Sequence, residues 1–124
     1  MDLRTPLARA KGLGAARQGC EKWWAQRVTA VALLPLTVWF VWFLAQLVQL
    51  PHADMLAWLG KPVNAVLLLA YLGTAFYHAV LGLTVIVEDY VHLFWLKALS
   101  LLALRLFVGM LAAVAVFAVV RIVP

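Results

Sequence analysis

The sequence is poor in the residues that most metal and catalytic sites require. It contains one cysteine, Cys20, and three histidines among 124 residues. A single thiol excludes an internal disulfide, a four-cysteine zinc site and an iron–sulfur cluster ligated by this chain alone. Cys20 lies beside a charged stretch and is interpreted as an incidental thiol.

Charge is scarce as well. Only 12% of the residues are charged, 67% are apolar, and the mean hydropathy is +1.01. Soluble domains are about half apolar and about a quarter charged. A chain this small cannot hide so much apolar surface in one core, and disordered chains have the opposite composition. The composition predicts a small integral membrane protein whose partner is the lipid bilayer and not a nucleic acid.

Several functional motifs are missing. The chain has no evident internal repeat, which argues against an inverted-repeat transporter. It also has no glycine-rich phosphate loop, nucleophile constellation or nucleotide-binding fingerprint. We therefore expect a chain that is not an enzyme on its own.

Three long apolar runs are what the sequence does have. They cover residues 28–50, 63–87 and 98–120, and the connectors at 51–62 and 88–97 are short. At about 1.5 Å per residue, each run is long enough to cross a hydrocarbon core of about 30 Å. Only helices satisfy their own backbone in lipid, so the fold class predicted is an all-α membrane protein with three transmembrane helices. Residues 1–27 form a basic tail, and residues 28–124 form the membrane anchor domain.

The distribution of charge predicts the orientation. Before the first run stand two acidic and six basic residues: Asp2, Glu21, Arg4, Arg9, Lys11, Arg17, Lys22 and Arg27. Basic residues concentrate on the cytoplasmic side, so the N-terminus is predicted to be cytoplasmic and the C-terminus periplasmic. A short mitochondrial presequence is an alternative interpretation of this tail. We favour orientation together with contact to anionic headgroups.

His78 is the one histidine within a span. It lies three residues past the middle of the second run, roughly 4–5 Å from the midplane. An ionisable residue at that depth is costly unless it is paired, so it is a functional candidate. Small neighbours at Ala75 and Gly82 allow two interpretations. His78 either packs against another helix or serves as an axial ligand of haem iron.

A haem held by two histidines would need a second chain. The first and third runs contain no histidine, His52 lies in the outer connector, and His92 is 14 residues beyond His78, roughly 21 Å along a helix. Neither His52 nor His92 can face His78 across a macrocycle. A bis-histidine haem here therefore requires a partner subunit.

Acidic and aromatic residues end the second run on its predicted cytoplasmic side. Asp89 follows His78 by 11 residues and returns to nearly the same helix face, about 16 Å away. The Tyr90 hydroxyl can donate to a quinone carbonyl, and carboxylates can relay the protons that quinone reduction requires. An acidic helix end with an interfacial tyrosine is the simpler alternative.

Two arginines remain. Arg27 lies at the inner end of the first run, where orientation explains it, but arginine is also the natural partner of a haem propionate or a quinone oxygen. Arg105 interrupts the third run. If the helix begins near Leu106, Arg105 extends toward water; if it begins earlier, Arg105 is buried and needs a partner.

Three motifs occur in an order that resembles a known family. They are WWAQRVTA at 23–30, HAVLG at 78–82 and EDYVH at 88–92. The chain resembles the hydrophobic membrane anchor subunit of succinate dehydrogenase (succinate:quinone oxidoreductase, respiratory complex II), most of all its alphaproteobacterial version. The resemblance covers nearly the whole chain. Its most specific part is a transmembrane histidine followed 11 and 12 residues later by Asp-Tyr.

The resemblance implies a non-catalytic subunit that takes part in electron transfer from succinate to ubiquinone. It implies His78 as an axial ligand of haem b, with the other ligand from a second, cytochrome b556-type anchor subunit. It also implies that Tyr90 binds the quinone, that Asp89 supports this site, and that Arg27 lies near the haem propionates or the quinone. A flavoprotein subunit and an iron–sulfur subunit would complete the complex in the inner membrane of a bacterium, a location we favour over the mitochondrion.

One departure from the family pattern is visible, because family members often carry a histidine where this chain has Lys22. Two rival hypotheses remain. One is a haem-free anchor or assembly protein in which His78 only packs against a helix. The other is a small transporter component with His78 in a proton path.

Overall fold

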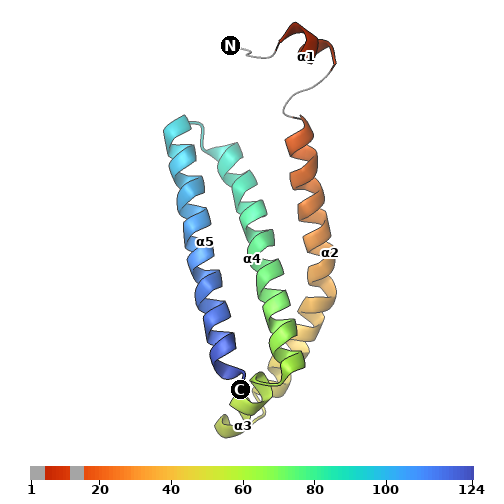
Figure 1. Cartoon of the computed structure of the whole chain (residues 1–124), viewed down its shortest axis with the longest axis vertical. Coiled ribbons are helices and arrows are strands. Elements are labelled where there is room, and N and C mark those ends of the chain that lie inside the picture. The colour runs from red at the N-terminus through yellow and green to blue at the C-terminus, as the bar shows by residue number, and fades with distance from the viewer. Residues whose placement is uncertain (1–4, 12–15) are drawn as a thin grey trace.

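The computed structural model describes residues 5–11 and 16–124. Three long helices lie side by side, and no β-strand occurs among the described residues (Figure 1). The long helices are α2 (Ala16–Leu47), α4 (Pro62–Tyr90) and α5 (Phe94–Ile122). All three are long and apolar enough to cross a membrane. The prediction of an all-α protein with three membrane-spanning helices is confirmed.

The helices extend beyond the predicted spans. α2 begins at Ala16 and ends at Leu47, so the expected boundary between tail and anchor at residues 27 and 28 falls inside it, and residues 48–50 form a turn. A run without charged residues shows which part of a helix can lie in the lipid hydrocarbon. The helix itself can continue into the membrane–water interface for as long as its backbone hydrogen bonds are satisfied. Pro35 stands within α2, as membrane helices tolerate.

Two short helices were not predicted. α1 (Pro6–Ala10) starts with a proline, and its capping residue Thr5 accepts a hydrogen bond from the Ala8 amide at 3.2 Å. α3 (His52–Leu59) follows Pro51 in the outer connector and has Asp54 in its first turn, where a carboxylate favours the helix dipole. The outer connector is therefore mostly helical.

α4 is the central helix, because it packs against α2 on one side and α5 on the other (Figure 1). The α4–α5 connection is only residues 91–93, and the Lys97 ammonium donates to the Glu88 carbonyl oxygen at 3.0 Å, which satisfies the end of α4. We call this end of the bundle, with Lys22, Glu88 and Lys97, the charged end. α5 begins well before Leu106, so Arg105 lies in the helix interior.

An aromatic cluster holds α2, α3 and α4 together at the end opposite the charged end. The Phe40 and Tyr71 rings stack with centroids 4.4 Å apart, and Phe43, which is 1% exposed, lies 6.5 Å from the Trp58 ring of α3. Stacked aromatic pairs add to the free energy of packing beyond their buried area. Aromatic rings therefore fill the α2–α4 contact at this end, and polar side chains take their place toward the charged end.

Gly60 allows α3 to approach the end of α5. A Cβ atom at this position would lie 2.9 Å from the Ile122 carbonyl oxygen and 3.2 Å from that of Leu56. The Gly60 φ of −74° suits any residue, so the constraint is the space alone.

We expect Gly60→Ala to destabilise the protein by about 1–3 kcal/mol, because backbone atoms cannot move aside as a flexible side chain can. The measurement is the thermal midpoint of the purified protein in detergent. Gly19→Ala is the matched control, since a Cβ there meets nothing within 4 Å. Equal midpoints for the two variants would contradict the steric explanation.

Candidate functional site

His78 lies on the face of α4 that contacts α2. Its Nδ1 atom is 2.9 Å from the Thr29 Oγ1 atom, and its Nε2 atom is 3.4 Å from the Gln26 side-chain nitrogen. Thr29 is buried, with 8% of its surface exposed. The transmembrane histidine predicted from sequence is thus held by two residues of α2, neither of which was predicted to contact it.

The partners of Thr29 determine where the imidazole carries its proton. The Thr29 hydroxyl donates to the Ala25 carbonyl oxygen at 2.8 Å, with the Gln26 carbonyl oxygen also within reach at 3.1 Å. A hydroxyl has one hydrogen, so toward His78 the Thr29 oxygen is an acceptor. His78 Nδ1 must then be the donor, and in the neutral ring the Nε2 lone pair is left available. This is the arrangement in which a histidine binds a metal through Nε2.

The Gln26 side-chain amide lies next to His78 Nε2, and its hydrogen bonds are poorly satisfied there. Its contact with that atom is long, and its Oε1 atom is buried without a hydrogen-bond partner among the described residues. Opposite lies Gly82, where a Cβ would come within 3.4 Å of the Gln26 side-chain nitrogen. A buried unsatisfied amide is costly. Gln26 is therefore the side chain that an incoming ligand of His78 would displace.

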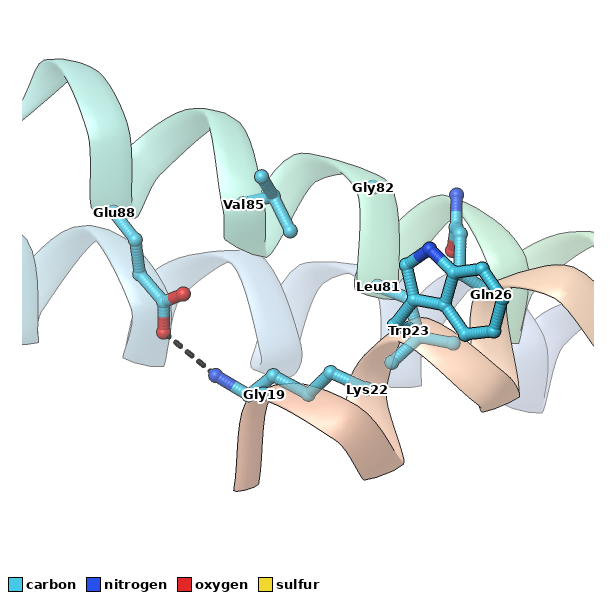
Figure 2. Close-up of a pocket in the computed structure, with 8 residues that line it drawn as sticks. All are labelled: Gly19, Lys22, Trp23, Gln26, Leu81, Gly82, Val85 and Glu88. Atoms are coloured by element: carbon cyan, nitrogen blue, oxygen red, sulfur yellow. Dashed lines mark hydrogen bonds and ion pairs between the residues drawn. The ribbon is translucent and has the colours of Figure 1, made fainter. Parts of the chain in front are cut away.

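A groove runs from Gln26 toward the charged end, between α2 and α4 (Figure 2). Its volume is about 450 Å³, within the range of roughly 300–1,000 Å³ typical of ligand pockets. The residues that line it are Gly19, Lys22, Trp23, Gln26, Leu81, Gly82, Val85 and Glu88. The lining is mostly apolar, with polar groups at its two ends. Such a groove suits a flat, largely apolar ligand that carries polar groups at its edge.

An ion pair closes the groove at the charged end. The Lys22 ammonium lies 2.8 Å from the Glu88 carboxylate, which links α2 to α4 (Figure 2). The two side chains are 44% and 38% exposed, so the pair contributes roughly 0–1 kcal/mol. Lys22 and Glu88 thus face each other across the groove.

Asp89 and Tyr90 lie next to the groove but do not line it. Asp89 is exposed, and Tyr90, the last residue of α4, is 79% exposed. The carboxylate that faces the groove belongs to Glu88. The Tyr90 hydroxyl is consequently available to a molecule or chain that approaches the charged end from outside.

The remaining candidates lie away from the groove. The Arg27 guanidinium stacks over the Trp23 ring at 5.4 Å, and its side chain is exposed. His52 is exposed in α3, and His92 is exposed with its Nδ1 atom donating to the Tyr90 carbonyl oxygen at 3.1 Å. In residues 5–11 and 16–124 no three His, Cys, Asp or Glu side chains are grouped to hold a metal ion. A haem iron would not require such a cluster, because the protein provides only its axial ligands.

Comparison with known proteins identifies the family of the chain. The family described as "Succinate dehydrogenase/Fumarate reductase transmembrane subunit" matches residues 1–119. The chain belongs to this family.

Individual relatives agree. A succinate dehydrogenase hydrophobic membrane anchor subunit of Rickettsia bellii is 34% identical over 108 residues, which cover 86% of this chain and 85% of the relative. The protein of the same name from Paracoccus denitrificans is 34% identical over 86 residues, which cover 69% and 67% of the two chains. No solved structure matches. The family and the alphaproteobacterial likeness expected from the motifs are confirmed.

The sequence pointed to His78 as a site residue. It did not predict that His78 contacts Thr29 and Gln26, or that Lys22 and Glu88 form an ion pair. A weak signal existed, because Lys22, Gln26 and Thr29 recur at intervals of three and four residues and so share one face of a helix. The matching face of α4 carries His78, Gly82 and Glu88. Only the packing of α2 on α4 brings the two faces together.

Proposed function

We propose that this chain is a membrane anchor subunit of succinate dehydrogenase that binds haem b together with a second anchor subunit and forms part of the ubiquinone reduction site. The observation that carries the proposal is His78, whose Nδ1 atom is tied to Thr29 at 2.9 Å and whose Nε2 atom points to a poorly held Gln26. The family and the names of the relatives support the part of the proposal that concerns succinate dehydrogenase.

The residues present fit a haem. His78 offers a nitrogen ligand, and displacement of Gln26 from His78 Nε2 would join this atom to the apolar groove, which Gln26 and Gly82 line, and so make room for a flat macrocycle. A haem bound there would supply a one-electron redox centre. His78 would hold the iron, Thr29 would hold His78, and Arg27 would turn from Trp23 to pair with a propionate or a quinone oxygen.

The quinone half of the proposal uses the charged end. The exposed Tyr90 hydroxyl donates to a quinone carbonyl, and Asp89 beside it accepts or relays a proton. The partners are the second, cytochrome b556-type anchor, the iron–sulfur subunit and the flavoprotein subunit. The basic N-terminal segment indicates that the charged end faces the cytoplasm of a bacterium, with the chain in its inner membrane.

Purification in mild detergent tests the proposal as a whole. We expect a flavoprotein, an iron–sulfur protein and a second small membrane protein to copurify, with a reduced-minus-oxidised haem b spectrum and succinate:quinone reductase activity. The same subunits without haem absorbance would support the haem-free anchor instead. Purification of the chain alone would favour the transporter hypothesis.

Thr29 provides a finer test as a positioning residue. Thr29→Val keeps the shape of the side chain and removes the acceptor of the His78 Nδ1 proton. Loss of such an outer partner typically costs about 10- to 100-fold in metal affinity. We expect haem to be lost more readily, and the remaining haem to show a more positive midpoint potential, because the imidazole becomes a weaker electron donor.

Thr29→Ser retains the hydroxyl and is the matched control. Its haem content and midpoint potential should stay near those of the native protein. A native potential in the valine variant would show that Thr29 does not position His78.

A further inference from the structure

Arg105 is a charge near the middle of a membrane-spanning helix. α5 runs from Phe94 to Ile122, and Arg105 lies three residues from its central residue, about 4.5 Å along the axis. The next charged residue toward the start of α5 is Lys97, which lies eight residues or about 12 Å from Arg105. Arginine at this depth is unfavourable unless it is paired, and intramembrane charges generally face protein or water.

The described residues of this chain do not supply the partner. Among the described residues Arg105 makes no hydrogen bond, ion pair or ring contact, and its side chain is exposed. The five acidic residues of the sequence are Asp2, Glu21, Asp54, Glu88 and Asp89, and none lies in the middle of a span. A second copy of the chain has the same acids at the same positions. A carboxylate at the depth of Arg105 must therefore come from a different chain.

Arg105 lies on a groove between α4 and α5 with a volume of about 330 Å³. Tyr77 of α4, which is 53% exposed, lines the same groove and adds a second hydrogen-bond donor. Gly73 and Gly109 also line it, and a Cβ at either position would meet nothing within 4 Å. Small residues at such a surface let the backbone of another helix approach closely.

The groove is separate from the site at His78. On α4, Tyr77 is rotated by about 100° and Gly73 by about 140° from His78. α5 borders this groove, whereas α2 borders the groove beside His78, and the two helices lie on opposite sides of α4 (Figure 1). Arg105 is therefore not placed to serve the proposed haem.

We propose that the α4–α5 groove receives a membrane-spanning helix of a different subunit of the complex, which carries an Asp or Glu side chain at the depth of Arg105. The inference rests on the proposed function only in that the chain is part of a complex. The charge of Arg105 requires an anion, the glycines allow close packing, and Tyr77 can donate to the same carboxylate. A lipid phosphate is the weaker occupant, because two turns of helix, apolar except for Ser100, separate Arg105 from Lys97.

Photo-crosslinking in the purified complex identifies the occupant. With p-benzoylphenylalanine at Tyr77, we expect a crosslink to a different membrane subunit, mapped by mass spectrometry to a span that contains Asp or Glu. The matched control is the same probe at Phe107, which is 64% exposed and rotated by about 200° from Arg105 on α5, and which should yield lipid adducts. Lipid adducts alone at Tyr77, a crosslink to a second copy, or a crosslink to a span without an acid would each overturn the proposal.

Variants at Arg105 test the ion pair itself. Arg105→Gln leaves the partner carboxylate unpaired in the membrane, so loss of the crosslinked subunit during detergent washing should become about tenfold faster or more. Arg105→Lys should restore retention in large part. Retention of the subunit by the glutamine variant at the native level would overturn the proposal. The crosslink at Tyr77 uses the native Arg105, so it decides the question even if the glutamine variant fails to insert, and neither readout depends on haem.

Discussion

Replacement of His78 by alanine is expected to remove the haem b absorbance of the purified complex. Alanine has no lone pair, so the iron of the proposed haem would lose its axial ligand from this chain. The effect should exceed the 10- to 100-fold loss of affinity typical for removal of an outer-shell partner, because the proposed bond to iron would itself be removed. The measurement is the reduced-minus-oxidised spectrum together with the ratio of haem to flavin.

Two controls separate ligation from packing. His78 also links α4 to α2 through Thr29 and Gln26, so the variant complex must still copurify and still oxidise succinate with an artificial dye. His52→Ala removes an exposed histidine in α3 and should leave the spectrum unchanged. A native spectrum in His78→Ala would assign the haem ligand to another chain and leave His78 as a packing residue.

Tyr90→Phe is expected to slow quinone reduction on the order of 10²-fold, in line with the loss of one hydrogen-bond donor or general acid at a reacting group. The substitution removes only the hydroxyl and keeps the ring. Succinate oxidation measured with an artificial dye should persist, because in the proposed complex that reaction takes place on other subunits. The measurement is the ratio of quinone-dependent to dye-dependent activity.

Tyr71→Phe is the matched control for this prediction. Tyr71 undergoes the same chemical change but stacks on Phe40 at 4.4 Å, far along α4 from the charged end. Both of its activities should stay near native levels. If Tyr90→Phe lowers quinone-dependent and dye-dependent activity equally, Tyr90 has a structural role and does not bind quinone.

The sequence predicted the three spans because an apolar run without charge is a property of the chain itself. It did not predict where the helices end. α2 continues through a basic segment down to Ala16, and α3 forms in a connector of ordinary composition. Helix ends depend on capping and on contacts such as that of Gly60 with Ile122, which join residues far apart in the chain.

The candidate site was likewise predictable only in part from the sequence. His78 could be singled out because a histidine is rare at that depth, and its motif neighbours pointed to the family. Thr29 and Gln26 could not be assigned to it, because 49 and 52 residues separate them from His78. Their contact depends on how α2 and α4 are rotated toward each other.

The sequence by itself determined the number of membrane spans, the family and the depth of His78, whereas the depth of Arg105 depended on where α5 begins. The spans and the depth of His78 follow from hydropathy and from the rise of a helix, and the family follows from the order of its motifs; none of these needs a tertiary contact. Only the tertiary structure decided what these side chains face: His78 lies against Thr29 on the α2 side of α4, and Arg105 lines the groove between α4 and α5 without a partner among the described residues. The reason is physical, because hydropathy sets how deep a residue lies, whereas packing between helices sets the direction of its side chain.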